Sequence, residues 1–171
     1  MVVSSTIGAL ISFAINFVVV LLFALFTHVH FTWRVLLLPL NFIQLYIIAL
    51  GLALLLSTMY VYFRDISHIW DVLQQVLFYA MPIIYPLSMV IGNNSLRGYG
   101  LLIAKIQLLN PIAQVIQDIR HNLIAPETQP TIWTMTSNPL LRAVPIVLSI
   151  LILVLGVYVF KRNNRKFAEV M

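Results

Sequence analysis

The sequence predicts an all-α, polytopic integral membrane protein, and three observations lead to that fold class. The 171-residue chain is 61% hydrophobic and only 9% charged, with a mean hydropathy of +1.00. A soluble domain carries roughly 25% charged residues, so this chain lacks the residues for a normal water-facing surface. Uncharged apolar runs fill most of the sequence. These runs do not alternate apolar and polar residues, which disfavours a membrane β-barrel.

The apolar runs predict four transmembrane helices, over approximately residues 7–26, 35–60, 72–91 and 143–160. A hydrocarbon core about 30 Å thick requires about 20 helical residues at roughly 1.5 Å each. The second run stays uncharged as far as residue 63, which allows a tilted helix or an interfacial end. The chain begins without a basic segment, so the first run is interpreted as a span and not as a signal peptide.

Small side chains in the second predicted span indicate a close contact with another helix. Residues 49–53 read ALGLA, which places small residues four apart on one side of a helix. Small residues let two helix backbones approach closely inside a membrane.

The C-terminal tail sets the predicted orientation. Of the ten Lys and Arg residues, four lie within residues 161–166, and basic residues beside a span tend to stay in the cytoplasm. The other basic residues do not decide the matter, since Arg64 would lie inside and five others outside. Four spans then place both termini and the Arg64 loop in the cytoplasm.

The third predicted span contains residues 82–86 (PIIYP), which predict a break or kink. Proline lacks an N–H and clashes with the preceding carbonyls. In hydrocarbon the freed carbonyls need partners, so we expect this segment to be buried against other helices or to line a path. Candidate path residues are Tyr79, Pro82, Tyr85 and Pro86. An aromatic belt at the membrane interface is the alternative role for the tyrosines.

Two short helices are predicted between the last two spans. Residues 101–109 are apolar but too few to span a bilayer. Asn110 followed by Pro111 predicts the cap and first turn of a helix over residues 111–124, which includes Arg120.

The second of these helices is predicted to be amphipathic. Its apolar residues follow helical spacing along one side: Ile112, Val115, Ile116, Ile119 and Leu123. Its polar residues occupy the opposite side: Gln114, Gln117, Asp118 and His121. We interpret it as a helix that lies in the plane of the outer interface. The alternative is a surface helix that packs on the spans by the same apolar stripe.

The sequence carries no recognised catalytic pattern. It lacks a phosphate-binding glycine loop, a zinc-binding HExxH motif and a GxSxG motif. It also contains no cysteine, so a thiolate metal site is excluded. His28 and His30 lie two apart without a third ligand nearby, which favours an interfacial turn over a metal site. We therefore expect a chain that is not an enzyme, with no cofactor or metal of its own and no nucleic-acid partner.

Several short motifs occur in a fixed order along the chain. They are VYFRDI at residues 61–66, PIIYP at 82–86, Asn110-Pro111 with Arg120, Phe160-Lys161, and FAE at 167–169. Together they resemble the membrane subunit of ABC transporters of the ABC-2 type, in the branch that exports polysaccharides, O-antigen and teichoic acids. The resemblance runs over essentially the whole chain.

This resemblance implies a bacterial cytoplasmic-membrane permease with six spans and both ends cytoplasmic, which works as a homodimer. It implies a separate ATPase subunit as partner, and a glycan or polyol-phosphate polymer on an undecaprenyl lipid carrier as substrate. In such permeases two further spans and an amphipathic helix precede the part seen here. The chain is therefore expected to be a fragment or truncated product lacking its N-terminal part. Tyr79 and Tyr85 would contact the sugar polymer.

The resemblance also assigns a role to the charged loop between the second and third spans. Arg64, Asp65 and Ile66 match the cytoplasmic loop that touches the ATPase subunit in the family. Arg64 could pair with a carboxylate of the partner. Asp65 could accept from a basic group of the partner, or cap a helix that starts near Ser67. The alternative is that both charges only keep the loop in water.

Other function classes stay open. A passive membrane scaffold or assembly factor fits a truncated chain, and an ABC-2 exporter of another substrate fits the same motifs. A secondary transporter usually has intramembrane charges or broken repeats, whereas the four predicted spans are free of charge.

Overall fold

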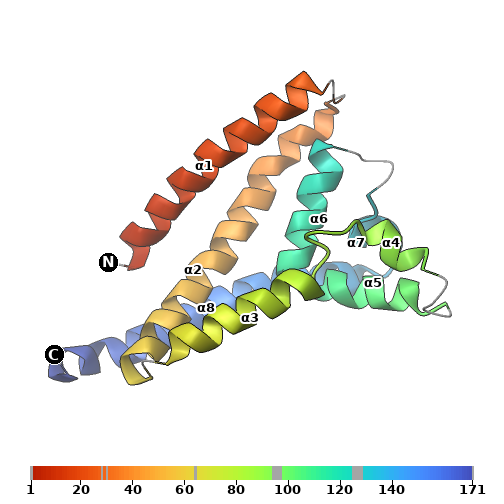
Figure 1. Cartoon of the computed structure of the whole chain (residues 1–171). Coiled ribbons are helices and arrows are strands. Elements are labelled where there is room, and N and C mark those ends of the chain that lie inside the picture. Colours follow the sequence, from red (N-terminus) through yellow and green to blue (C-terminus); the bar gives the residue numbers. More distant parts are fainter. Residues whose placement is uncertain are drawn as a thin grey trace.

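The computed structural model describes residues 2–27, 29, 31–63, 65–93, 98–124 and 129–170, with side chains described within residues 4–163 of these ranges. The regular structure in this part of the chain is entirely helical, which confirms the predicted all-α class (Figure 1). The elements are α1 (Val2–Phe26), η1 (Trp33–Leu37), α2 (Leu38–Tyr62), α3 (Ile66–Ala80), α4 (Leu87–Ile91), α5 (Gly100–Leu109), α6 (Pro111–Leu123), α7 (Ile132–Met135) and α8 (Pro139–Val170).

Three helical segments are long and apolar enough to cross a membrane. They are Ser4–Phe26, Trp33–Tyr62 and Pro139–Asn163, with mean hydropathies of 2.7, 2.1 and 2.8. These segments contain the first, second and fourth predicted spans. Only 6%, 22% and 17% of the residues in their most apolar stretches are buried inside the protein. Such extensive apolar exposure is typical of helices surrounded by lipid, so the chain is a membrane protein.

The third predicted span is not found as one continuous helix. The described chain instead has α3, with 15 residues, and α4, with five, separated by an irregular segment. Met81, which precedes Pro82, is extended at φ −93° and ψ 153°, as expected for a residue before proline. Pro86 is likewise extended and directly precedes α4, which begins at Leu87. The predicted break is therefore confirmed, whereas neither half is long enough to span a bilayer alone.

The helix α1 forms an antiparallel hairpin with α2 (Figure 1). An aromatic cluster joins the two helices. Phe42 of α2 lies edge-to-face with Phe13 and Phe17 of α1, with ring centroids 5.3 and 4.7 Å apart. Aromatic pairs in this geometry are favourable beyond the area that they bury.

The helices α2 and α8 cross with their backbones in contact, at Gly51 and Gly156. A Cβ atom on Gly156 would lie 2.4 Å from the Gly51 carbonyl oxygen, and one on Gly51 would lie 2.8 Å from the Leu153 Cα atom. Only glycine fits at this crossing. The close approach predicted from residues 49–53 is confirmed, and Gly51 itself makes it.

The short helices gather at one end of the molecule (Figure 1). A small apolar core there contains Leu87 of α4, Ala104 and Leu108 of α5, and Ile132 of α7. The α1–α2 turn and η1 lie at the opposite end from the two termini and the α2–α3 connection. The helix α6 runs beside the N-terminal half of α2, and α5 and α8 also contact it.

Candidate functional site

The N-terminus of α6 forms as predicted. The Asn110 side chain accepts a hydrogen bond from the backbone N–H of Ile112, at 3.0 Å, and Pro111 occupies the first turn. A side-chain cap of this kind satisfies one of the free amides at a helix start. The residue at which α6 starts is therefore fixed by local sequence.

The polar side of α6 faces the interior of the protein. Gln114, Gln117 and Asp118 are 2%, 0% and 7% exposed, whereas Ile112 and Ile116 are half-buried. Val115 and Leu123 of the apolar stripe are also buried, at 0% and 3% exposed, so α6 is covered on both sides and its placement in the outer interface stays a prediction. Among apolar spans the polar groups find hydrogen-bond partners only inside the protein, while apolar side chains are compatible with lipid.

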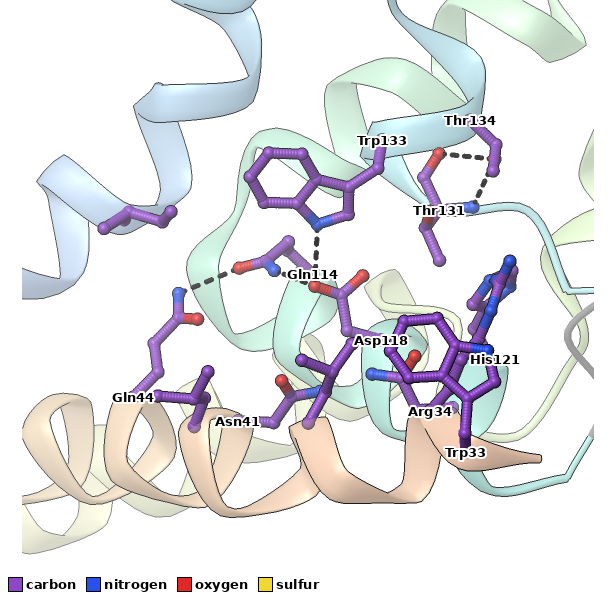
Figure 2. A pocket seen from close by; sticks show the side chains of 14 residues that line it. Trp33, Arg34, Asn41, Gln44, Gln114, Asp118, His121, Thr131, Trp133 and Thr134 are labelled. Carbon is purple, nitrogen blue, oxygen red and sulfur yellow. Dashed lines mark hydrogen bonds between the residues drawn. The ribbon is translucent and has the colours of Figure 1, made fainter. Parts of the chain in front are cut away.

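A pocket of about 570 Å³ lies between α6 and the N-terminal part of α2 (Figure 2). The residues around α7 and the N-terminal part of α8 line its remaining sides. Its lining comprises Trp33, Arg34, Leu37, Leu40, Asn41, Gln44, Gln114, Asp118, His121, Asn122, Thr131, Trp133, Thr134 and Ile146. The pocket thus combines two tryptophans and apolar side chains with a concentrated set of polar groups.

The carboxyl group of Asp118 is the centre of this polar set. Its Oδ2 accepts hydrogen bonds from the Gln114 amide and from the Trp133 indole N–H, the latter at 3.1 Å (Figure 2). Its Oδ1 is buried without a partner among the described residues. Burial raises the pKa of Asp118 to about 6, although the hydrogen bonds from Trp133 and Gln114 lower it in part.

Arg34 and His121 link η1 to α6. The Arg34 guanidinium bonds to Nε2 of the His121 ring, and Nδ1 of that ring lies 2.7 Å from the Gln129 carbonyl oxygen. A guanidinium can only donate and a carbonyl can only accept. Nε2 is therefore the acceptor and Nδ1 carries the proton, which defines one neutral tautomer of the histidine.

Gln44 connects α2 to both α6 and α8. Its amide donates to Gln114 at 2.8 Å and to the Ser149 hydroxyl at 3.1 Å. Ser149 in turn donates to the Pro145 carbonyl oxygen at 2.8 Å. One turn earlier on α2, the Asn41 side-chain nitrogen is buried without a partner in the described part of the chain. The pocket therefore holds a hydrogen-bond network with two unpaired atoms.

A second polar cluster holds the break between α3 and α4. Arg120 donates from Nη1 to the Pro82 carbonyl oxygen at 2.6 Å, and from Nη2 to the Ile83 carbonyl oxygen. Gln107 donates to the Ala80 carbonyl oxygen at 3.0 Å. The expectation that carbonyls freed by proline need partners is confirmed. Residues of α5 and α6 supply those partners, and the sequence alone did not identify them.

The predicted path residues do not line the pocket. The Tyr85 hydroxyl lies within the break, accepting from Gln107 at 2.9 Å and donating to Ala80 at 3.3 Å, and Pro82 and Pro86 bound the same segment. The Tyr79 side chain is 69% exposed on α3. Its ring packs edge-to-face on its neighbour Phe78. A role of these residues in translocation stays a prediction.

The predicted coupling loop is described in part. Arg64 lies outside the described residues. Asp65 is exposed and directly precedes α3, which begins at Ile66, one residue before the predicted start near Ser67. The Asp65 side chain makes no capping hydrogen bond, so the capping role is wrong. Its backbone is helical, at φ −76° and ψ −4°, and not extended as at a typical N-cap.

Within the described ranges, no three His, Asp or Glu side chains are placed to hold a metal ion together. His28 and His30 lie outside those ranges. The pocket was missed because its polar residues were considered one segment at a time. Arg34, Asn41 and Gln44 recur at helical spacing at the start of one predicted span, and the polar residues of α6 do the same. Two matched polar stripes on neighbouring apolar elements could have indicated that they face each other.

Comparisons of this chain with protein-family models, with curated proteins and with solved structures find no match. The fold and the pocket define the chain as a helical membrane protein with a buried polar network. Any finer function has to be argued from the residues themselves.

Proposed function

We propose that the chain is the membrane-spanning subunit of an ABC exporter that moves a lipid-linked polysaccharide or teichoic-acid-like polymer across the cytoplasmic membrane. A separate ATPase subunit would drive it. The observation that carries the proposal is the polar side of α6, which meets polar residues of α2 inside an apolar bundle. Polar groups inside membrane proteins commonly mark the path of a substrate or ion. The ordered motifs of the sequence supply the class of exporter.

The pocket favours a transport role over a passive scaffold. A polar network that serves only packing is expected to have all its donors and acceptors satisfied. Here Asn41 Nδ2 and Asp118 Oδ1, on two residues that line the pocket, both lack a partner in the described structure, as do Gln107 Oε1 and Gln117 Oε1 on residues outside it. A ligand that binds transiently in the pocket would supply partners for its two unpaired atoms, whereas a purely structural network would leave neither unpaired.

Energy would reach this chain by contact with its ATPase partner. The sequence has no nucleotide-binding motif, and only a short connection separates the end of α2 at Tyr62 from the start of α3 at Ile66. A displacement of this loop would act on both helices. The chain would work as a homodimer in the membrane, with both termini and this loop on the cytoplasmic side.

A proton-coupled secondary transporter is the second candidate, because Asp118 is a buried carboxyl group beside the pocket with a pKa near 6. Such groups serve as proton relays in transporters. The two candidates differ in their energy source. Export that persists when the membrane potential and proton gradient are collapsed, but stops when ATP is depleted, favours the ABC exporter.

The decisive experiment measures ATPase capture and polymer export together. An affinity-tagged chain is expressed in its native membrane, and vanadate-sensitive ATPase activity is measured after purification. We expect Arg64→Ala and Asp65→Ala to lower both readouts together, since breaking an interfacial charge pair costs roughly 2–5 kcal/mol. An exposed pair would cost about 1 kcal/mol or less. Lys105→Ala, on the exposed side of α5, is the matched control. Undiminished capture and export in both loop variants would remove the coupling proposal.

A further inference from the structure

The pocket between α2 and α6 has the size of a ligand site. Its volume is about 570 Å³, within the range of roughly 300–1,000 Å³ that small-molecule sites occupy. A single water takes up about 30 Å³ in the liquid. One bridging water would therefore leave most of this pocket unfilled.

The two unpaired atoms in its lining have opposite hydrogen-bonding character. Asp118 Oδ1 is an acceptor on a side chain that is only 7% exposed. Asn41 Nδ2 is a donor, and this atom is buried although the Asn41 residue as a whole is half-buried. Leaving such groups buried and unpaired is unfavourable. A ligand that satisfies both atoms has to donate to the carboxylate and accept from the amide.

This requirement selects among ligand groups. An ammonium group only donates, and a carbonyl or phosphate oxygen only accepts, so each leaves one of the two atoms unpaired. An anion would also be repelled by the Asp118 carboxylate. A hydroxyl group donates and accepts at once. The charges of Arg34 and Asp118 oppose each other in the lining, which further favours a neutral ligand.

The walls of the pocket suit a ring or chain with apolar C–H faces and hydroxyls along its rim. Trp33 lies on η1 and Trp133 on α7, and both side chains line the pocket (Figure 2). The bond to Asp118 fixes the orientation of the Trp133 indole. Tryptophan offers a large apolar face with little loss of conformational entropy. Leu37, Leu40 and Ile146 complete the apolar lining.

We propose that this pocket binds a polyhydroxylated group, a sugar ring or a polyol, with one hydroxyl bridging Asp118 Oδ1 and Asn41 Nδ2. The source of that group is the exported polymer, so this part of the inference rests on the proposed function. The pocket adds the place where the polymer is recognised, at the end of the bundle opposite the basic tail. Binding itself requires neither ATP nor a partner subunit.

The test is a binding titration on the whole chain in phosphatidylcholine nanodiscs, which avoids detergents that carry sugars. The chain has three tryptophans, and Trp70→Phe on α3 leaves only Trp33 and Trp133 as fluorescent reporters. Ribitol and N-acetylglucosamine are the probes, and glycine betaine at equal osmolality is the control without hydroxyls. We expect at least one probe to change the fluorescence in a saturable way, while betaine does not.

Two variants locate the binding. Asp118→Asn keeps the shape but removes the carboxylate, and Asn41→Leu removes the amide donor without touching the Gln114–Asp118–Trp133 bonds. Each is expected to weaken binding by about tenfold or more. Asp71→Asn, an exposed position on α3, should leave the dissociation constant unchanged. Asn41→Leu keeps the test informative if Asp118→Asn lowers stability.

Two results would contradict the proposed binding of a polyhydroxylated group in this pocket. A response to both probes that never saturates and matches betaine means that the pocket holds water only. Saturable binding that neither Asp118→Asn nor Asn41→Leu weakens places the site elsewhere. Either outcome leaves the transport proposal standing, because that proposal depends on ATPase capture. Loss of ATPase capture, conversely, does not affect this titration.

Discussion

Arg120 of α6 donates a hydrogen bond to the carbonyl oxygen of Pro82, across the break that separates α3 from α4, at 2.6 Å. The same guanidinium reaches the next carbonyl, of Ile83. The prolines leave these two carbonyls without helical partners, and the planar guanidinium group of Arg120 donates a hydrogen bond to each of them. The irregular segment between α3 and α4 is therefore stabilised by hydrogen bonds from a residue that lies far away in the sequence.

Arg120→Met should destabilise the fold, because it leaves the Pro82 and Ile83 carbonyls without their donors in a low-dielectric environment. Hydrogen bonds to charged groups are worth about 1.5–3 kcal/mol, so we expect a loss of about 2–4 kcal/mol in the free energy of unfolding. Arg120→Lys should lose less, since it keeps one donor. Unfolding in mixed micelles measures both, with Lys105→Met as the exposed control. Equal stability of Arg120→Met and wild type would show that the bonds to the break contribute nothing.

Gly156→Ala should force α2 and α8 apart. The added Cβ would lie 2.4 Å from the Gly51 carbonyl oxygen, which no side-chain adjustment can relieve. Overpacking of this kind costs about 1–3 kcal/mol. The matched control is Gly8→Ala in α1, where nothing lies within 4 Å of the new atom. A Gly156→Ala protein that unfolds at the wild-type denaturant concentration would contradict the observed crossing.

Stability should fall as pH rises, through Asp118. Its pKa is raised in the folded state to about 6, from 3.8 for a free group, so the folded protein binds the proton more tightly than the unfolded chain. Its contribution is greatest below pH 4 and declines as pH rises through about 6, by up to about 3 kcal/mol. Asp118→Asn should remove this part of the slope. The measurement is the unfolding free energy of both proteins at pH 4.5 and 8, where other titrating groups cancel in the difference. Parallel pH profiles would refute the prediction.

Membrane orientation can be read by single-cysteine labelling, because the chain has no cysteine of its own. Asn93→Cys, beyond α4, should react with an impermeant maleimide in intact cells. Asp65→Cys, beside the α2–α3 connection, should react only after lysis. Both positions are exposed, so accessibility within the protein does not limit labelling. The reversed pattern would place the basic tail outside.

Features set by local sequence were predictable here. The break at residues 82–86 and the Asn110 cap follow from proline and side-chain chemistry within a few residues, and both are present. The three spans follow from run length. The third predicted span, over residues 72–91, was overestimated, because the length of an uncharged run takes no account of the proline break inside it.

Features that depend on distant residues were not predictable. The assignment of Arg120 to the Pro82 carbonyl, and of Gln44 to Gln114, requires knowing which helices are neighbours. The burial of the polar side of α6 was not predicted, since an amphipathic pattern alone does not tell whether water, lipid or protein surrounds the helix. In a bundle with apolar outer surfaces, the polar side turns inward.

The two polar clusters have a mechanical consequence because they share one helix. α6 has 13 residues, and it presents Asp118 to the pocket and Arg120 to the break. A short helix of this kind moves as a single rod, and rolling it to free the Trp133 bond would also draw the guanidinium away from Pro82. A displacement of α6 that breaks the contact with Trp133 is therefore expected to disturb the contact with Pro82 as well. A substrate that displaces α6 would then also act on α3, the helix that begins directly after the α2–α3 loop.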